Sequence, residues 1–107
     1  MPVIHTSELP AKEIAPGFSA RFIHTPSQTI AYVHIKAGSI LPEHEHPHEQ
    51  VTHVLEGQLQ LTINGEVSVI EPSVVAVIPG NVRHSGLALT DCVALDVFYP
   101  VREDYKS

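Results

Sequence analysis

Clusters of basic residues and long apolar runs are both absent from this sequence, and each absence excludes a class of protein. Six Lys and Arg residues stand against twelve Asp and Glu, for a net charge of -6, so a nucleic-acid partner is not expected. No run reaches about 18 apolar residues, and no basic segment precedes an apolar one near Met1, which argues against a membrane span or leader. We therefore expect a soluble, cytoplasmic protein.

Cysteine is nearly absent as well. The single Cys92 cannot form an internal disulfide, which is compatible with a reducing compartment. It lies in an apolar stretch, so we expect it to pack as a small apolar residue in a strand rather than to act as a ligand or a reactive thiol.

The length of the chain bounds its organisation. With 107 residues, 43% of them hydrophobic, it is most simply one domain over residues 1–107. Proline and glycine leave room for only an arm or a short strand in residues 1–17, so we place the main body at about 18–100, before a short C-terminal tail. A core of this size benefits from contact with a second copy, and we predict a homodimer.

The rest of the chain alternates short β-branched or aromatic runs with turn residues, which is typical of strands, and no segment shows helical periodicity. The predicted strands are 18–24, 29–35, 40–46, 50–55, 58–63, 66–70, 74–78, 83–89 and 92–99. The first two are expected to form a hairpin, and Asn64-Gly65 marks a second hairpin because both residues accept positive φ. The pattern predicts an all-β sandwich or barrel.

Two histidines in one predicted strand, His44 and His46, are two positions apart, so their rings point to the same face. A turn at Pro47 would bring the carboxamide oxygen of Gln50 to the same point, while His53 would then face the other side. Imidazoles with a neutral oxygen donor suit one divalent transition metal such as Mn, Fe, Ni or Zn. Because the chain has eight histidines, chance spacing of solvated histidines is the alternative.

A fourth ligand is available at His84. It follows the turn at Pro79-Gly80-Asn81 and shares a face with the small residues Gly86 and Ala88, which leave room for a ligand. Taken alone, His84 is more ordinarily a surface or core histidine.

The first of these stretches resembles the first cupin motif. Gly38, His44, His46 and Gly57 fall at the spacing of that motif, and Gln50 stands where a glutamate is usual. A neutral amide in place of a carboxylate leaves a bound dication less neutralised, which makes it a stronger Lewis acid and favours an anionic substrate.

The second stretch resembles the other cupin motif through Pro79 and His84, with Ser73, Asn81 and Ala88 departing from it. Asparagine tolerates the left-handed backbone that this turn requires, whereas the other two departures bear on the shape of the loop. The resemblance covers about residues 29–100. It implies a small antiparallel barrel of two packed sheets, a cupin-type double-stranded β-helix, with the four ligands His44, His46, Gln50 and His84 around one metal.

The last predicted strand carries a carboxylate in a row suited to the interior, because Asp96 shares a face with Ala94 and Phe98. An unpaired buried carboxylate is costly. Near a metal, Asp96 can act as a general acid and base while Arg102, beyond Pro100, holds a substrate carboxylate through two parallel hydrogen bonds. The alternative is that Asp96 pairs with Arg102 and closes the end of the barrel.

Together with the ligand set, Asp96, Phe98 and Arg102 are similar in type and spacing to the pocket of small cupins that ketonise 4,5-unsaturated monouronates from pectin and alginate. The resemblance implies ring opening and tautomerisation, with Arg102 holding the uronate carboxylate, Asp96 moving protons and Phe98 shaping the pocket. Two other functions stay open. Open positions on a redox metal would allow a dioxygenase, and Arg102 with the metal would suffice for a non-catalytic binder of small sugar acids.

Overall fold

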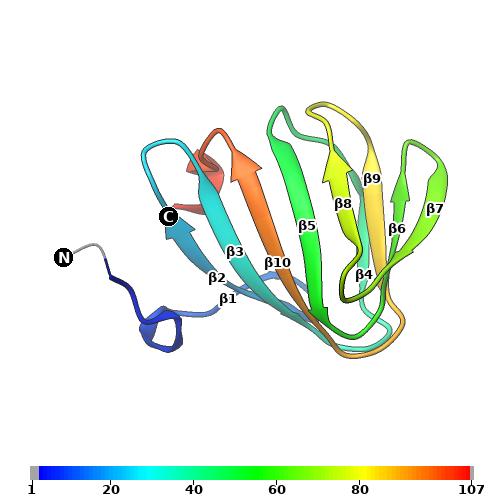
Figure 1. Ribbon diagram of the computed structural model, residues 1–107, viewed down its shortest axis with the longest axis horizontal. Helices are drawn as coiled ribbons and strands as arrows, with labels where there is room; N and C mark the ends of the chain where they lie inside the picture. The colour runs from blue at the N-terminus through cyan, green and yellow to red at the C-terminus, as the bar shows by residue number, and fades with distance from the viewer. Residues whose placement is uncertain (1–2, 107) are drawn as a thin grey trace.

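The computed structural model describes residues 3–106, which form two antiparallel β-sheets packed face to face (Figure 1). The strands are β1 (Lys12–Ala15), β2 (Phe18–His24), β3 (Thr29–Ile35), β4 (Ile40–His44), β5 (Glu49–Glu56), β6 (Leu59–Ile63), β7 (Glu66–Ile70), β8 (Val75–Ile78), β9 (His84–Ala88) and β10 (Cys92–Tyr99). The large sheet has six strands in the order β1-β2-β3-β10-β5-β8, and the small sheet has four, β4-β9-β6-β7.

Two short 3₁₀ helices flank the strands, η1 (Thr6–Glu8) near the N-terminus and η2 (Glu103–Tyr105) near the C-terminus. Neither of them, and no other described segment, is a helix of the length and apolar character that a membrane crossing requires.

The predicted all-β class is confirmed, and every predicted strand is present with ends displaced by at most two residues. Strand β4 stops at His44, so the prediction that one strand continues to His46 is wrong in its end point. The two sheets share no strand and are not closed into a continuous barrel, which agrees with the prediction of two packed antiparallel sheets.

Both predicted hairpins are present. Strands β2 and β3 pair antiparallel, with Phe18 opposite Ile35. Between β6 and β7, Asn64 has φ 50 and Gly65 has φ 80, the two positive values that a type I′ turn requires.

The inner face of the large sheet changes from apolar to polar along its strands. At one end, Phe18, Ile35 and Cys92 lie in register and are almost fully buried, as expected for Cys92. Toward the other end, Asp96 lies directly opposite Thr52, and the next inward row places Phe98 opposite Gln50. The apolar end forms the core. Polar side chains therefore face one another at the other end, the end with Asp96 and Gln50, which we call the mouth of the sandwich.

The turn after β5 depends on a glycine. Gly57 has φ +89, and a Cβ at this position would collide with the backbone oxygen of Asp91. Gly38 has a similar φ of +82 but open space around it. Only the first position therefore combines a left-handed backbone with a close approach of main chain.

We expect Gly57→Ala to lower the free energy of unfolding by at least about 1 kcal/mol more than Gly38→Ala does, because the control carries only the cost of the left-handed backbone. Urea denaturation of both variants measures the difference. Equal losses would contradict the importance of the contact with Asp91.

Candidate metal centre

Three imidazoles converge at the polar mouth of the sandwich. His44 ends β4 and lies opposite His84 at the start of β9, while His46 follows in the loop after β4. The ring centroids of His44 and His84 are 4.2 Å apart, and those of His46 and His84 are 5.0 Å apart. One nitrogen from each ring lies within 4.8 Å of the others. The cluster can therefore hold a metal ion.

Each of these rings is held in place by the backbone carbonyl of a residue two positions away in the chain. The Nδ1 atoms lie in hydrogen-bonding contact with carbonyl oxygens: His44 with Pro42 (2.8 Å), His46 with His48 (3.0 Å) and His84 with Val82 (2.9 Å). A carbonyl only accepts, so each Nδ1 carries the hydrogen. The lone pair is left on Nε2 in all three rings, which is the arrangement that metal-binding histidines show.

Burial keeps two of the rings neutral. The exposed fractions of His46 and His84 are 8% and 3%. Desolvation, aided by the nearby charge of Arg102, lowers the pKa of His46 to about 4, and burial also lowers the pKa of His84. The Nε2 atom of His84 is buried and has no hydrogen-bond partner among residues 3–106. A buried lone pair without a donor fits a cation.

The oxygen of Gln50 belongs to the same cluster. Its Oε1 atom lies 3.0 Å from Nε2 of His46, and its amide nitrogen donates to Oγ1 of Thr52 at 3.0 Å. With His46 neutral and its hydrogen on Nδ1, two lone pairs face each other. Two facing lone pairs are favourable when both coordinate the same cation. The set of three imidazoles and one amide therefore suits a divalent transition metal.

Asp96 faces this cluster from β10. Its Oδ1 atom accepts a hydrogen bond of 2.7 Å from the hydroxyl of Thr52. Burial raises the pKa of Asp96 to about 6, against the opposing effects of hydrogen bonds from Thr52 and Gln50 and of the charge of Arg102. Among residues 3–106, Arg102 forms its ion pair with another carboxylate and not with Asp96, the partner named in the alternative.

The other carboxylate is that of Asp104. Nε and Nη2 of Arg102 donate to its two carboxylate oxygens at 3.0 and 2.7 Å. The guanidinium carbon lies 4.8 Å from the ring centroid of Phe98 and 4.1 Å from that of Tyr105. The Phe98 ring is in turn 5.8 Å from that of His46, centroid to centroid. Phe98 therefore stands between the imidazoles and a buried, oriented arginine.

Three residues that contact the site, Thr52, Asp104 and Tyr105, are not among the site residues predicted from the sequence. Thr52 is two positions after Gln50 on the same strand face, a spacing that places it beside the predicted ligand. No comparable pattern marks the other two, because they reach Arg102 only through the turn of η2.

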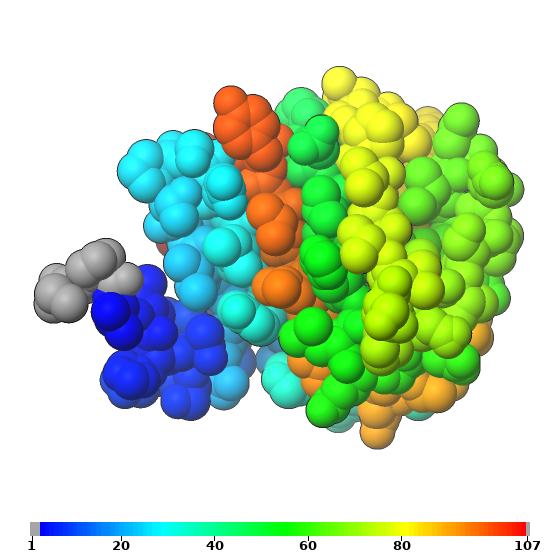
Figure 2. All heavy atoms as spheres, in the orientation of Figure 1, coloured from blue at the N-terminus to red at the C-terminus, as the bar shows by residue number. Residues whose placement is uncertain are grey.

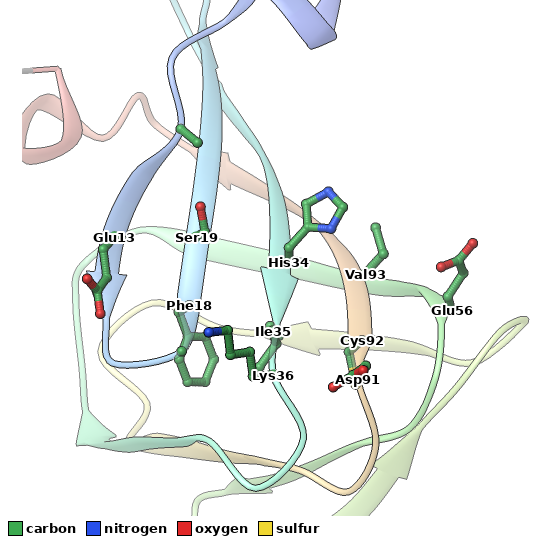
Figure 3. Close-up of a pocket in the computed structure, with 12 residues that line it drawn as sticks. Glu13, Phe18, Ser19, His34, Ile35, Lys36, Glu56, Asp91, Cys92 and Val93 are labelled. Atoms are coloured by element: carbon green, nitrogen blue, oxygen red, sulfur yellow. The ribbon is translucent and has the colours of Figure 1, made fainter.

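Two hollows differ in their relation to this site. A depression of about 700 Å³ lies at the opposite end of the strands, and its charged side chains, among them Glu13, Lys36 and Asp91, are spread around it without converging (Figure 3). A cavity of about 50 Å³ lies inside the sandwich, and Gln50 and Asp96 are part of its lining. The convergent chemistry is at the small cavity, and the larger hollow contains none of the predicted ligands.

The chain is similar in sequence and fold to known proteins. The model of the cupin domain family matches residues 31–98. The chain is 27% identical over 101 residues to the pectin degradation protein KdgF of Dickeya dadantii (strain 3937), covering 92% of each protein. The structure of KdgF from Halomonas sp. is similar with a TM-score of 0.87 and 27% identity over 94% of both chains.

A further solved structure, an RmlC-like cupin from Shewanella frigidimarina NCIMB 400, has a TM-score of 0.91 at 22% identity. The match covers 98% of this chain and 96% of that one, and it shows that the two proteins share a fold.

Removing one imidazole tests the centre. We expect His84→Asn to weaken binding of Mn²⁺, Ni²⁺ or Zn²⁺ by more than about 100-fold, because even residues that only support metal ligands contribute about 10- to 100-fold. Isothermal titration calorimetry measures the affinity, and the exposed His34→Asn is the matched control. Unchanged binding by the His84 variant would show that the ion is held elsewhere.

Proposed function

This chain belongs to the cupin domain family, and from that premise we propose that it is a metal-dependent isomerase that converts 4,5-unsaturated monouronates to their linear keto form. The observation that carries the proposal is the placing of Asp96 and Arg102 beside a site of three imidazoles and one amide. The similarity of the chain to two KdgF proteins, one of them named for pectin degradation, supports a substrate derived from acidic sugars.

The proposed ligands are His44, His46, Gln50 and His84, and the cofactor is one divalent ion such as Mn, Fe, Ni or Zn. Such an ion, when bound, supplies Lewis acidity that polarises substrate oxygens. The ligand atoms are all neutral, because the histidines present Nε2 lone pairs and Gln50 presents an amide oxygen. The site therefore keeps a positive potential that attracts an anionic sugar.

Arg102 is proposed to hold the substrate carboxylate. A guanidinium has five N–H donors in a rigid fork, and Asp104 occupies two of them. The remaining donors can take a second carboxylate, while Phe98 offers a flat apolar face between this point and the imidazoles. The substrate would thus lie across Phe98 with its acidic end at Arg102.

Asp96 is proposed to move the protons. Ring opening breaks the bond between the anomeric carbon and the ring oxygen, and the proton of the anomeric hydroxyl leaves as the aldehyde forms. The ring oxygen leaves as an enolate, and one proton returned to the neighbouring carbon of the double bond gives the ketone, so one proton is lost, one is gained and the reaction is an isomerisation. A carboxyl whose pKa is raised to about 6 by burial can both take and return that proton near neutral pH.

The assay follows the loss of the enol-ether absorbance of unsaturated galacturonate and of its mannuronate-derived counterpart. We expect the metal-loaded protein to accelerate this loss and Asp96→Asn to lower kcat by about 100-fold or more, because general acid–base catalysis contributes about 10²–10⁴-fold. Asp91→Asn, a matched change at an exposed position away from the site, should leave kcat unchanged.

No acceleration with any of the four metals would overturn the proposal. Full activity of the Asp96 variant would remove its catalytic role, substrate binding without turnover would identify a binding protein, and oxygen uptake would identify an oxygenase.

The homodimer is a separate proposal, supported by the outer face of the large sheet. Figure 2 shows β3, β10, β5 and β8 side by side on this face. One row of directly paired outward residues is wholly apolar: Ile23, Ile30, Val97, Val51 and Val77. At the end of that row Val77 is 62% exposed. A flat apolar row on a solvent face is suited to packing against a second copy.

We expect Val77→Glu to convert a dimer into a monomer, because a charge would be buried in the apolar row. Multi-angle light scattering measures the mass. Val67→Glu, at a position 58% exposed on the small sheet, should leave the dimer intact. A monomeric wild-type protein would contradict the proposal.

A further inference from the structure

The carboxamide of Gln50 has two chemically different ends. Its oxygen carries lone pairs and can bind a cation, whereas its amino group has only hydrogens to donate. A glutamine serves a metal site when the oxygen end is turned inward, so the neighbours that hold it in that orientation are part of the site.

A chain of hydrogen bonds sets the orientation. The carboxylate of Asp96 accepts the single hydroxyl hydrogen of Thr52, with a distance of 2.7 Å between Oγ1 and Oδ1. The hydroxyl has then spent its only hydrogen and can take part in a further bond only as an acceptor. It accepts from the amino group of Gln50 at 3.0 Å, which leaves Oε1 of Gln50 facing His46.

The surroundings of Thr52 make this chain specific. Thr52 is 2% exposed, and its neighbours in register across the sheet are Asp96 on β10 and Ala76 on β8. Alanine offers no polar atom in place of the hydroxyl. A valine would keep the branched shape of Thr52 and would remove the hydroxyl that bonds both Asp96 and the amide of Gln50, leaving only the direct interaction of that amide with Asp96.

We infer that Thr52 is a positioning residue of the metal centre, because its hydroxyl turns the carboxamide oxygen of Gln50 toward the three imidazoles. The inference rests on the proposed metal site and adds to it a residue that touches neither ion nor substrate. Its role is to choose between two orientations of a ligand.

The first experiment measures the affinity for Zn²⁺ or Mn²⁺ by calorimetry for the wild type, Thr52→Val and Thr52→Ser. We expect about a 10- to 100-fold loss in the valine variant, the range for residues that orient ligands, and recovery in the serine variant, which restores the hydroxyl. Thr62→Val on β6 makes the same chemical change at a side chain that alternates with the buried Leu61 and so lies on the outer face of the small sheet, and this variant should bind as the wild type does.

The second experiment separates positioning from loosening of the fold. In a Gln50→Glu background the ligand has two equivalent oxygens, so orientation no longer matters and Thr52→Val should change the affinity less than about threefold. An equal loss in both backgrounds would show that Thr52 only supports the packing. Thermal unfolding of the metal-free variants checks that each one is folded.

The outcomes also separate this inference from the proposed function. If the wild type binds neither ion, the metal site itself is absent. If the wild type binds and His84→Asn does not, while Thr52→Val binds as tightly as the wild type, the metal site stands and the role of Thr52 is wrong.

Discussion

The contact between each imidazole and a nearby backbone carbonyl is the constraint from which the chemistry of this molecule follows. A carbonyl cannot donate, so the three Nδ1 atoms keep their hydrogens and the three Nε2 atoms keep their lone pairs. The carbonyls come from residues two positions before His44 and His84 and two positions after His46. The local course of the chain therefore decides the tautomer, and the sandwich has only to bring the rings together.

The two sheets bring the rings together because the inner face of the large sheet is apolar at one end and polar at the other. Apolar residues gather at one end, where Phe18 and Cys92 are buried, and polar residues meet at the other, where Asp96 lies opposite Thr52. At that end the hydroxyl of Thr52 is the partner of both Asp96 and the amide nitrogen of Gln50. Arg102 illustrates the same logic, because Asp104 compensates its charge while an aromatic ring fixes the plane of its guanidinium.

Much of this was accessible from the sequence, and the reasons differ by residue. Alternation predicted that Asp96 faces inward, the turn expected at Pro47 predicted the position of Gln50, and the turn chemistry of Asn64-Gly65 predicted its hairpin, because each of these depends on neighbours in the chain. His46 was correctly predicted to join the cluster, but as part of a strand. Strand β4 ends before it, and a loop positions its ring. The pairing of Arg102 with Asp104 instead of Asp96 could not be predicted, because it depends on how the tail folds back over Phe98.

The open edge between the two sheets has a mechanical consequence. His44 and His84 belong to the small sheet and Gln50 to the large one, and no strand is common to both. A metal ion bound by these side chains together would link the two sheets, which no ladder of strand hydrogen bonds joins among the described residues. Binding of the ion and the packing of the two sheets against each other are then thermodynamically linked, so that each stabilises the other.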